Sequence, residues 1–109
     1  MFIVDTLTNT RVNQFALTGS VSSDPAPDLM EISPNGNRIF FSMRGPIPLT
    51  GNNPIFNNAV GRTPGVGIIR VTEGGENGEF FAYVPITNIV AGVERADPHG
   101  LKVRVSEYD

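Results

Sequence analysis

The single histidine of this chain, His99, is the residue best suited to transfer a proton or to bind a metal ion. It stands in the run Asp97-Pro98-His99-Gly100, where a strand is expected to start. An imidazole changes charge near neutral pH, and its neutral form is a common metal ligand. No second ligand stands at a spacing typical of metal sites, so a turn histidine is the simpler interpretation. We therefore expect no metal site and no bound cofactor.

Carboxylates form two groups along the sequence. Asp24, Asp28 and Glu31 could make an acidic cluster, although Asp-Pro turns also begin loops for local backbone reasons. The second group lies among glycines and lacks the regular offsets of a calcium-binding loop, so we expect a solvated turn there. Its members are Glu73, Glu76 and Glu79.

Nucleophilic catalysis and phosphate binding find little support in the sequence. Ser20, Ser22 and Ser23 have no Gly-x-Ser-x-Gly context, which disfavours a serine nucleophile. The glycine-rich stretch 61–67 lacks the Gly-Lys-Ser/Thr ending of a phosphate-binding loop, and Pro64 interrupts it. We expect no self-contained catalytic site.

The segment Pro46–Pro64 is the best candidate for a ligand-binding or partner-binding loop. It is rich in proline and asparagine and longer than most connections in small domains, and long loops often carry function. Arg44 and Arg62 flank it and could contact an anionic group, and Asn52 and Asn53 lie within it. The alternative is a loop without a specific ligand.

Strands and turns account for the rest of the sequence. Pro34-Asn35-Gly36-Asn37 is the clearest turn, because proline fixes the first corner and Asn-Gly accepts positive φ. No segment has an apolar face at helical spacing over three turns, so the predicted fold is all-β. The apolar residues Phe40, Phe41, Phe80 and Phe81 are interpreted as core aromatics. The predicted strands are Phe2–Thr6, Arg11–Leu17, Leu29–Ser33, Arg38–Met43, Val66–Thr72, Glu79–Val84 and Leu101–Val105, and Pro85–Arg95 is expected to be a short helical turn or a loop.

Composition narrows the class of protein. Glycine and proline make up 21 of 109 residues, which indicates many turns. The net charge is −3 and the eight basic residues are scattered, so nucleic-acid binding is disfavoured. The absence of cysteine excludes disulfides and thiolate chemistry, and no apolar run is long enough to predict a membrane-spanning helix.

Two internal matches indicate a repeat. Ile3-Val4-Asp5-Thr6 corresponds to Ile69-Arg70-Val71-Thr72, and the stretch 24–32 corresponds to 97–103. The period of about 65–70 residues exceeds that of a propeller blade, but removing the 46–64 insertion restores the usual size. A chain that opens directly on a strand and ends within another unit is expected to be a slice of a repeat protein.

Two motifs resemble a known family. Val4-Asp5-Thr6-Leu7-Thr8-Asn9-Thr10-Arg11-Val12 resembles the Asp-Thr-x-Thr-Asn-x-Val element of YVTN-type β-propeller repeats. Ile32-Ser33-Pro34-Asn35-Gly36-Asn37-Arg38-Ile39-Phe40-Phe41 resembles the Ser-Pro-Asp-Gly hairpin that these repeats share with lactonase-like propellers. The resemblance covers Phe2–Met43 well and Gly67–Val105 loosely.

The resemblance implies a fragment of a β-propeller: one complete four-stranded antiparallel blade with partial neighbouring blades. Residues 2–17 would be the outer strand pair of a first blade, 28–85 a full blade with the insertion 46–64, and 97–105 the inner strand of a next blade. The implied function is a binding or scaffolding module in a larger protein. The implied partners are neighbouring propeller blades or further copies of the chain.

Two alternatives stay open. The chain could belong to a propeller enzyme, a lactonase-like hydrolase or a metal- or haem-dependent oxidoreductase, in which Asp28, Glu31 and His99 face the central channel. It could instead be a small self-contained β-sandwich. The resemblance and the lack of cysteine favour a secreted or periplasmic location.

Overall fold

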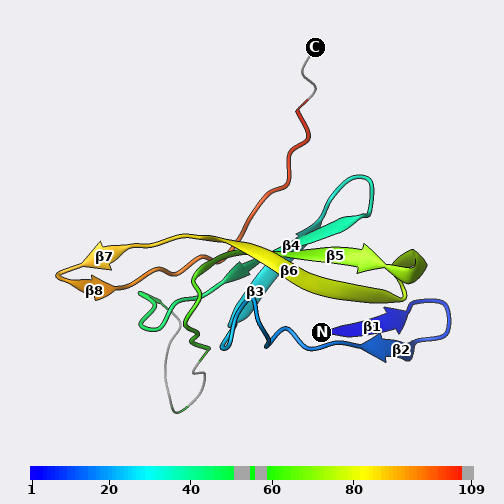
Figure 1. Ribbon diagram of the computed structural model, residues 1–109, viewed down its shortest axis with the longest axis horizontal. Coiled ribbons are helices and arrows are strands. Elements are labelled where there is room, and N and C mark those ends of the chain that lie inside the picture. Colours follow the sequence, from blue (N-terminus) through cyan, green and yellow to red (C-terminus); the bar gives the residue numbers. More distant parts are fainter. Residues whose placement is uncertain (51–54, 56–58, 107–109) are drawn as a thin grey trace.

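The chain is all-β and built from antiparallel sheets (Figure 1). The computed structural model describes residues 1–50, 55 and 59–106. No helix in this part of the chain has the length and apolar character needed to span a bilayer. The elements are β1 (Phe2–Asp5), β2 (Thr10–Gln14), β3 (Pro27–Ile32), β4 (Arg38–Met43), β5 (Gly65–Thr72), the 3₁₀ turn η1 (Glu73–Gly75), β6 (Asn77–Pro85), β7 (Ile89–Val90) and β8 (Val93–Glu94).

The main body is a four-stranded sheet in the order β3-β4-β5-β6, in which each strand pairs with the next one along the chain. The turn between β3 and β4 confirms the sequence prediction. Gly36 has φ of 75°, and the Asn35 side chain accepts a 3.0 Å hydrogen bond from the Asn37 amide. The Asn35 bond and the freedom of glycine at positive φ close this hairpin.

One face of the sheet carries the hydrophobic core. Phe41, Met43, Ile69 and Phe80 are buried and form one cluster. The rings of Phe41 and Phe80 meet edge to face with centroids 5.1 Å apart. Gly67 pairs with Phe41 across the sheet, and a Cβ at this position would lie only 2.3 Å from Cζ of Phe41. The absence of a side chain at Gly67 therefore makes room for the Phe41 ring.

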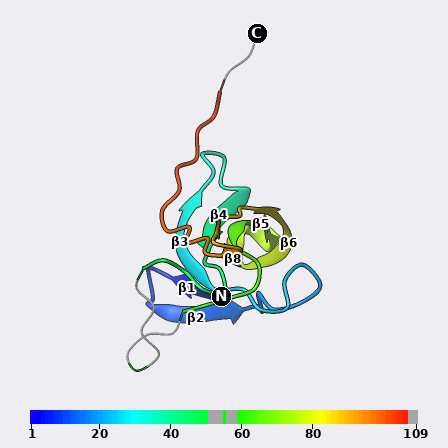
Figure 2. The same cartoon turned by 90° about the vertical axis from the view of Figure 1, so that its left-hand side faces the viewer.

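The β1–β2 hairpin and the residues after it cover this core face. Met1, Phe15, Leu17 and Val21 pack against the buried cluster. Figures 1 and 2 both place the hairpin beside the four-stranded sheet. The two predicted strands of this hairpin are confirmed, and β2 ends earlier than expected, at Gln14.

The opposite face of the sheet is half-buried. Phe40 lies there because its neighbours in β4 point to the core. The Phe81 ring contacts two guanidinium groups, with Arg38 at 5.3 Å and Arg70 at 4.4 Å from the ring centroid. The prediction of four core aromatics is therefore correct for Phe41 and Phe80, whereas Phe40 and Phe81 belong to this second face.

Two segments differ from the sequence predictions. The stretch 85–95 contains a small hairpin, β7–β8, instead of a helical turn, because Ala91 and Gly92 both have positive φ and make a tight reversal. Residues 97–105 form no strand. A strand requires a neighbouring backbone to bond with, and this segment instead meets the sheet through side chains, as described below.

Candidate functional site

Five polar side chains from three parts of the chain meet at one end of β3 and β4. We call this group the clamp. One residue belongs to β3, one follows β4, one lies in the loop after it, and two belong to the segment after β8. The residues of the clamp are Asp28, Arg44, Thr50, Asp97 and His99.

The centre of the clamp is a buried ion pair between Arg44 and Asp97. Nε of Arg44 lies 2.8 Å from Oδ1 of Asp97, and the two side chains are 5% and 7% exposed. The amide and the hydroxyl of Thr50 both donate to Oδ2 of Asp97, at 2.8 and 2.6 Å, and Arg44 donates to the Thr50 carbonyl oxygen. The pair thus ties the loop after β4 to the segment after β8.

These contacts set the charge of Asp97. Burial alone would raise the pKa of the Asp97 carboxyl, because it disfavours the charged form. The hydrogen bonds from Arg44 and Thr50, together with the Arg44 charge, outweigh burial and hold the pKa of Asp97 far below its usual range. These contacts therefore favour the ionised form of Asp97 in acidic as well as in neutral solution.

His99 connects this pair to β3. Its Nδ1 lies 2.7 Å from Oδ2 of Asp28, and its Nε2 lies 2.9 Å from Oγ1 of Thr50 and 3.2 Å from Oδ2 of Asp97. The hydrogen bond to Asp28 raises the pKa of His99 above its ordinary value against a smaller opposing effect of burial, and Asp97 adds to the rise. The arrangement favours an imidazolium that bridges two carboxylates.

The clamp is a set of mutually satisfied hydrogen bonds. No group of three or more acidic or histidine side chains in the described part of the chain is arranged to hold a metal ion. In the same residues, every buried side-chain nitrogen or oxygen has a hydrogen-bond partner. This arrangement can fasten three chain segments together, and the half-exposed His99 can also hold or donate a proton.

The other predicted site residues lie elsewhere or have other partners. Glu31 forms a 3.0 Å ion pair with Lys102. Arg62 is exposed and lies 3.9 Å from Asp24, so it does not join Arg44. The predicted loop residues Asn52 and Asn53 lie outside the described residues.

Sequence reasoning grouped Asp28 and His99, together with Glu31, as channel-facing residues in the enzyme alternative, and it assigned Arg44 to the loop that follows β4. It missed Thr50, and it gave Asp97 no role beyond its place in the run before an expected strand. Nothing in the local sequence marks Thr50, because its partners lie 47 and 49 residues away. The signal that could have led to Asp97 is the Asp-Pro-His run, which places two groups able to bridge the same partner two residues apart.

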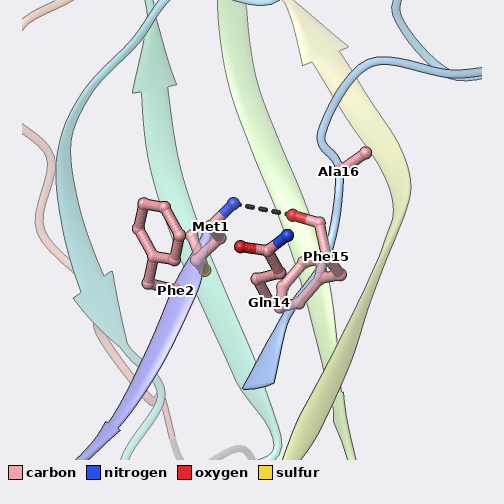
Figure 3. A pocket seen from close by; sticks show the side chains of 5 residues that line it. All are labelled: Met1, Phe2, Gln14, Phe15 and Ala16. Carbon is pink, nitrogen blue, oxygen red and sulfur yellow. Dashed lines mark hydrogen bonds between the residues drawn. The ribbon is translucent and has the colours of Figure 1, made fainter. Parts of the chain in front are cut away.

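The molecule also has a hollow of about 230 Å³ at the start of the β1–β2 hairpin (Figure 3). Figure 3 shows the amino group of Met1 bonded to the Phe15 carbonyl oxygen, at 2.7 Å. No acidic, basic or nucleophilic side chain lines the hollow, so it offers no chemistry comparable to that of the clamp. Its lining residues are Met1, Phe2, Gln14, Phe15 and Ala16.

Comparison with known proteins identifies no family for this chain. The chain matches no protein-family model, and no curated protein and no solved structure is similar to it. The features that bear on its function are therefore the four-stranded sheet and the clamp.

Proposed function

We propose that the four-stranded sheet is one blade of a β-propeller and that the chain acts as a binding or scaffolding module within a larger protein, without catalysis of its own. The β3-β4-β5-β6 meander is compatible with a blade, since blades are four-stranded antiparallel sheets packed face to face. The Asp-Thr and Ser-Pro-Asn-Gly motifs support the same proposal.

The observation that carries the proposal is the exposed apolar surface of β3, an edge strand of the four-stranded sheet. Leu29, Met30 and Ile32 are 59%, 54% and 55% exposed, although each is a large apolar residue within a sheet. Met30 and Ile32 pair with Phe41 and Ile39, so they lie on the core face of the sheet at its open edge, and we call these two residues the β3 patch. Large apolar side chains exposed on an open edge strand support a protein interaction site at this edge.

The molecule is less compact than a closed domain of its size. The Cα radius of gyration is 15.3 Å, compared with about 13 Å for a compact domain of this size. The accessible surface is 7283 Å², whereas size scaling gives about 5,900 Å² for a monomer of 11.7 kDa. Part of this excess belongs to the β7–β8 hairpin and the C-terminal segment, which project from the body in Figure 1, and neighbouring blades or further copies of the chain would cover the part on the sheet.

Sedimentation velocity tests the proposal. We expect the wild-type chain to associate as its concentration rises, because the β3 patch removes apolar surface from water when two sheets meet. The double variant Met30→Ser/Ile32→Ser should associate at least about tenfold more weakly than the wild type, because each of the two side chains contributes apolar area to the contact.

Leu7→Ser is the matched control, because Leu7 is 93% exposed but lies in the turn between β1 and β2, away from the patch. It should associate like the wild type. A wild-type chain that remains monomeric at all concentrations and melts cooperatively would contradict the proposal that the sheet packs against others. It would favour a self-contained β-sandwich.

One observation favours a second function, a contribution to an enzyme site of the lactonase-like type. Asp28, His99 and Thr50 stand in hydrogen-bonded series, as a carboxylate, an imidazole and a hydroxyl do in hydrolase sites. Since Thr50 donates its hydroxyl proton to Asp97, the reacting group would be the imidazolium of His99, which could protonate the leaving oxygen of a lactone.

Alanine substitution of Asp28, Glu31 and His99, one at a time, tests this second function through lactone hydrolysis. Loss of about 10²–10⁴ in rate for His99→Ala is the result expected of a general acid. Glu31→Ala should change the rate little, because Glu31 pairs with Lys102. Wild-type rates of lactone hydrolysis in all three variants would exclude these residues from catalysis.

A further inference from the structure

The segment 95–104, which we call the strap, crosses the second face of the four-stranded sheet. Its His99 carbonyl oxygen accepts a hydrogen bond from Oγ of Ser42 in β4. Together with residues 101–104 of the strap, Phe40 and Val66 of the sheet line a pocket of about 270 Å³. Figure 1 shows the chain passing the sheet and then leaving the body of the molecule. The strap therefore covers an apolar strip that would otherwise face water.

Two ion contacts of different strength hold the strap. Near its start, Asp97 is bonded to Arg44 in a site closed to solvent. Near its end, Lys102 meets Glu31 at 3.0 Å, but the Lys102 side chain is 85% exposed, and exposed pairs add little stability. His99 lies between these two contacts. The hold on the outer half of the strap consequently depends most on His99.

Both ring nitrogens of His99 face acceptors. Nδ1 meets the Asp28 carboxylate, and Nε2 meets Oγ1 of Thr50 and Oδ2 of Asp97. Thr50 uses its own hydroxyl hydrogen on Asp97, at 2.6 Å, so it can only accept from the ring. A doubly protonated imidazolium satisfies both sides, whereas a neutral ring would place a lone pair against an acceptor at one of them.

We propose that His99 is a pH-sensitive latch: with its proton it fastens the outer half of the strap, residues 99–104, to β3, and without its proton it releases this half and opens the Phe40–Val66 strip. Asp97 remains bound to Arg44 in both states and acts as the hinge. This device is independent of whether the sheet is a propeller blade.

The charged and titratable groups around His99 determine the direction of the switch. Asp28 faces it from β3 and Asp97 from the strap itself, and both carboxylates favour the protonated ring. The positive charge of Arg44, which follows β4, disfavours the protonated ring, but its effect is reduced because Arg44 is paired with Asp97. Lys102 of the strap and Glu31 of β3 form an ion pair whose two charges largely cancel.

The sign of the pH effect follows from the raised pKa of His99. A group whose pKa is higher in the closed state stabilises that state fully below its unperturbed value, about 6.5, and loses this contribution as pH rises through the raised value. The strap should therefore be held most firmly below about pH 6.5 and progressively less firmly as the pH rises through the raised pKa of His99.

Imidazole NMR and nuclear Overhauser contacts together test the latch. His99 is the chain's single histidine, so its ring signals are unambiguous. We expect a titration midpoint above the ordinary value, and nuclear Overhauser contacts between the strap side chains Leu101 and Val103 and the sheet residues Phe40 and Val66 should be lost with the same midpoint. Asp28→Asn should lower both midpoints together.

His99→Gln should abolish the pH step while leaving the β4–β5 amides protected, since the side chain of His99 is 48% exposed and outside the core. Lys102→Gln is the matched control: it removes a neighbouring strap contact but should keep the pH step. An ordinary His99 midpoint, contacts between the strap and the sheet that do not change with pH, or a pH step that persists in His99→Gln would each overturn the latch.

Discussion

Replacing Asp97 by alanine should lower the free energy of unfolding by about 3–5 kcal/mol, because it breaks a buried ion pair from one side. The substitution removes the negative charge that faces the buried Arg44 guanidinium, and it also removes the acceptor of both Thr50 hydrogen bonds. Small domains have total stabilities of about 5–15 kcal/mol, so this loss would be a large fraction of the whole. Urea denaturation followed by circular dichroism measures the change.

The Arg70–Glu79 pair provides the matched control for the Asp97 experiment. Its nitrogen and oxygen lie 3.0 Å apart, similar to the distance in the clamp, but the two side chains are 43% and 60% exposed. Glu79→Ala should therefore cost less than about 1 kcal/mol. Equal losses for the two variants would mean that burial does not make the Arg44–Asp97 pair important.

Phe41→Ala should be similarly destabilising, by about 3–5 kcal/mol, because Phe41 is fully buried and central to the cluster with Met43, Ile69 and Phe80. Removing the ring also leaves an empty space above Gly67, which has no side chain to fill it. The measurement is again the urea midpoint, with the melting temperature as a second readout.

Phe2→Ala removes the same ring from a position that is 65% exposed. Its cost should be within about 0.5 kcal/mol, as for other surface substitutions. If Phe2→Ala were as costly as Phe41→Ala, Phe2 would belong to the buried core, which would contradict its exposed position in the structure.

Much of the fold was predictable because it is encoded locally. Arg38–Met43 alternates between two faces and follows an Asn-Gly turn, so the strand and its boundaries agree with the structure. The glycine-rich acidic stretch after Thr72 is a tight turn, as expected, and its Glu73 even adopts a positive φ of 53°. Turn chemistry and period-two alternation depend only on neighbouring residues.

The clamp was not predictable as a unit because its contacts are long-range. Asp28 and His99 are 71 residues apart, and Arg44 and Asp97 are 53 apart. The strand predicted at 97–105 was wrong for the same reason: alternation of apolar and basic residues indicates an extended preference, but only a neighbouring backbone makes a strand. The β7–β8 hairpin was missed because Ala91 is an unusual residue at positive φ.

Urea denaturation at a series of protein concentrations tests most directly whether the open sheet needs a neighbour. If sheets of separate copies cover one another, association stabilises the folded state by mass action, and the unfolding midpoint should rise over a hundredfold range of chain concentration. Met30→Ser/Ile32→Ser should flatten this dependence. A midpoint that is the same at every concentration, in a chain that stays monomeric, would contradict the proposal that these sheets are built to pack against others.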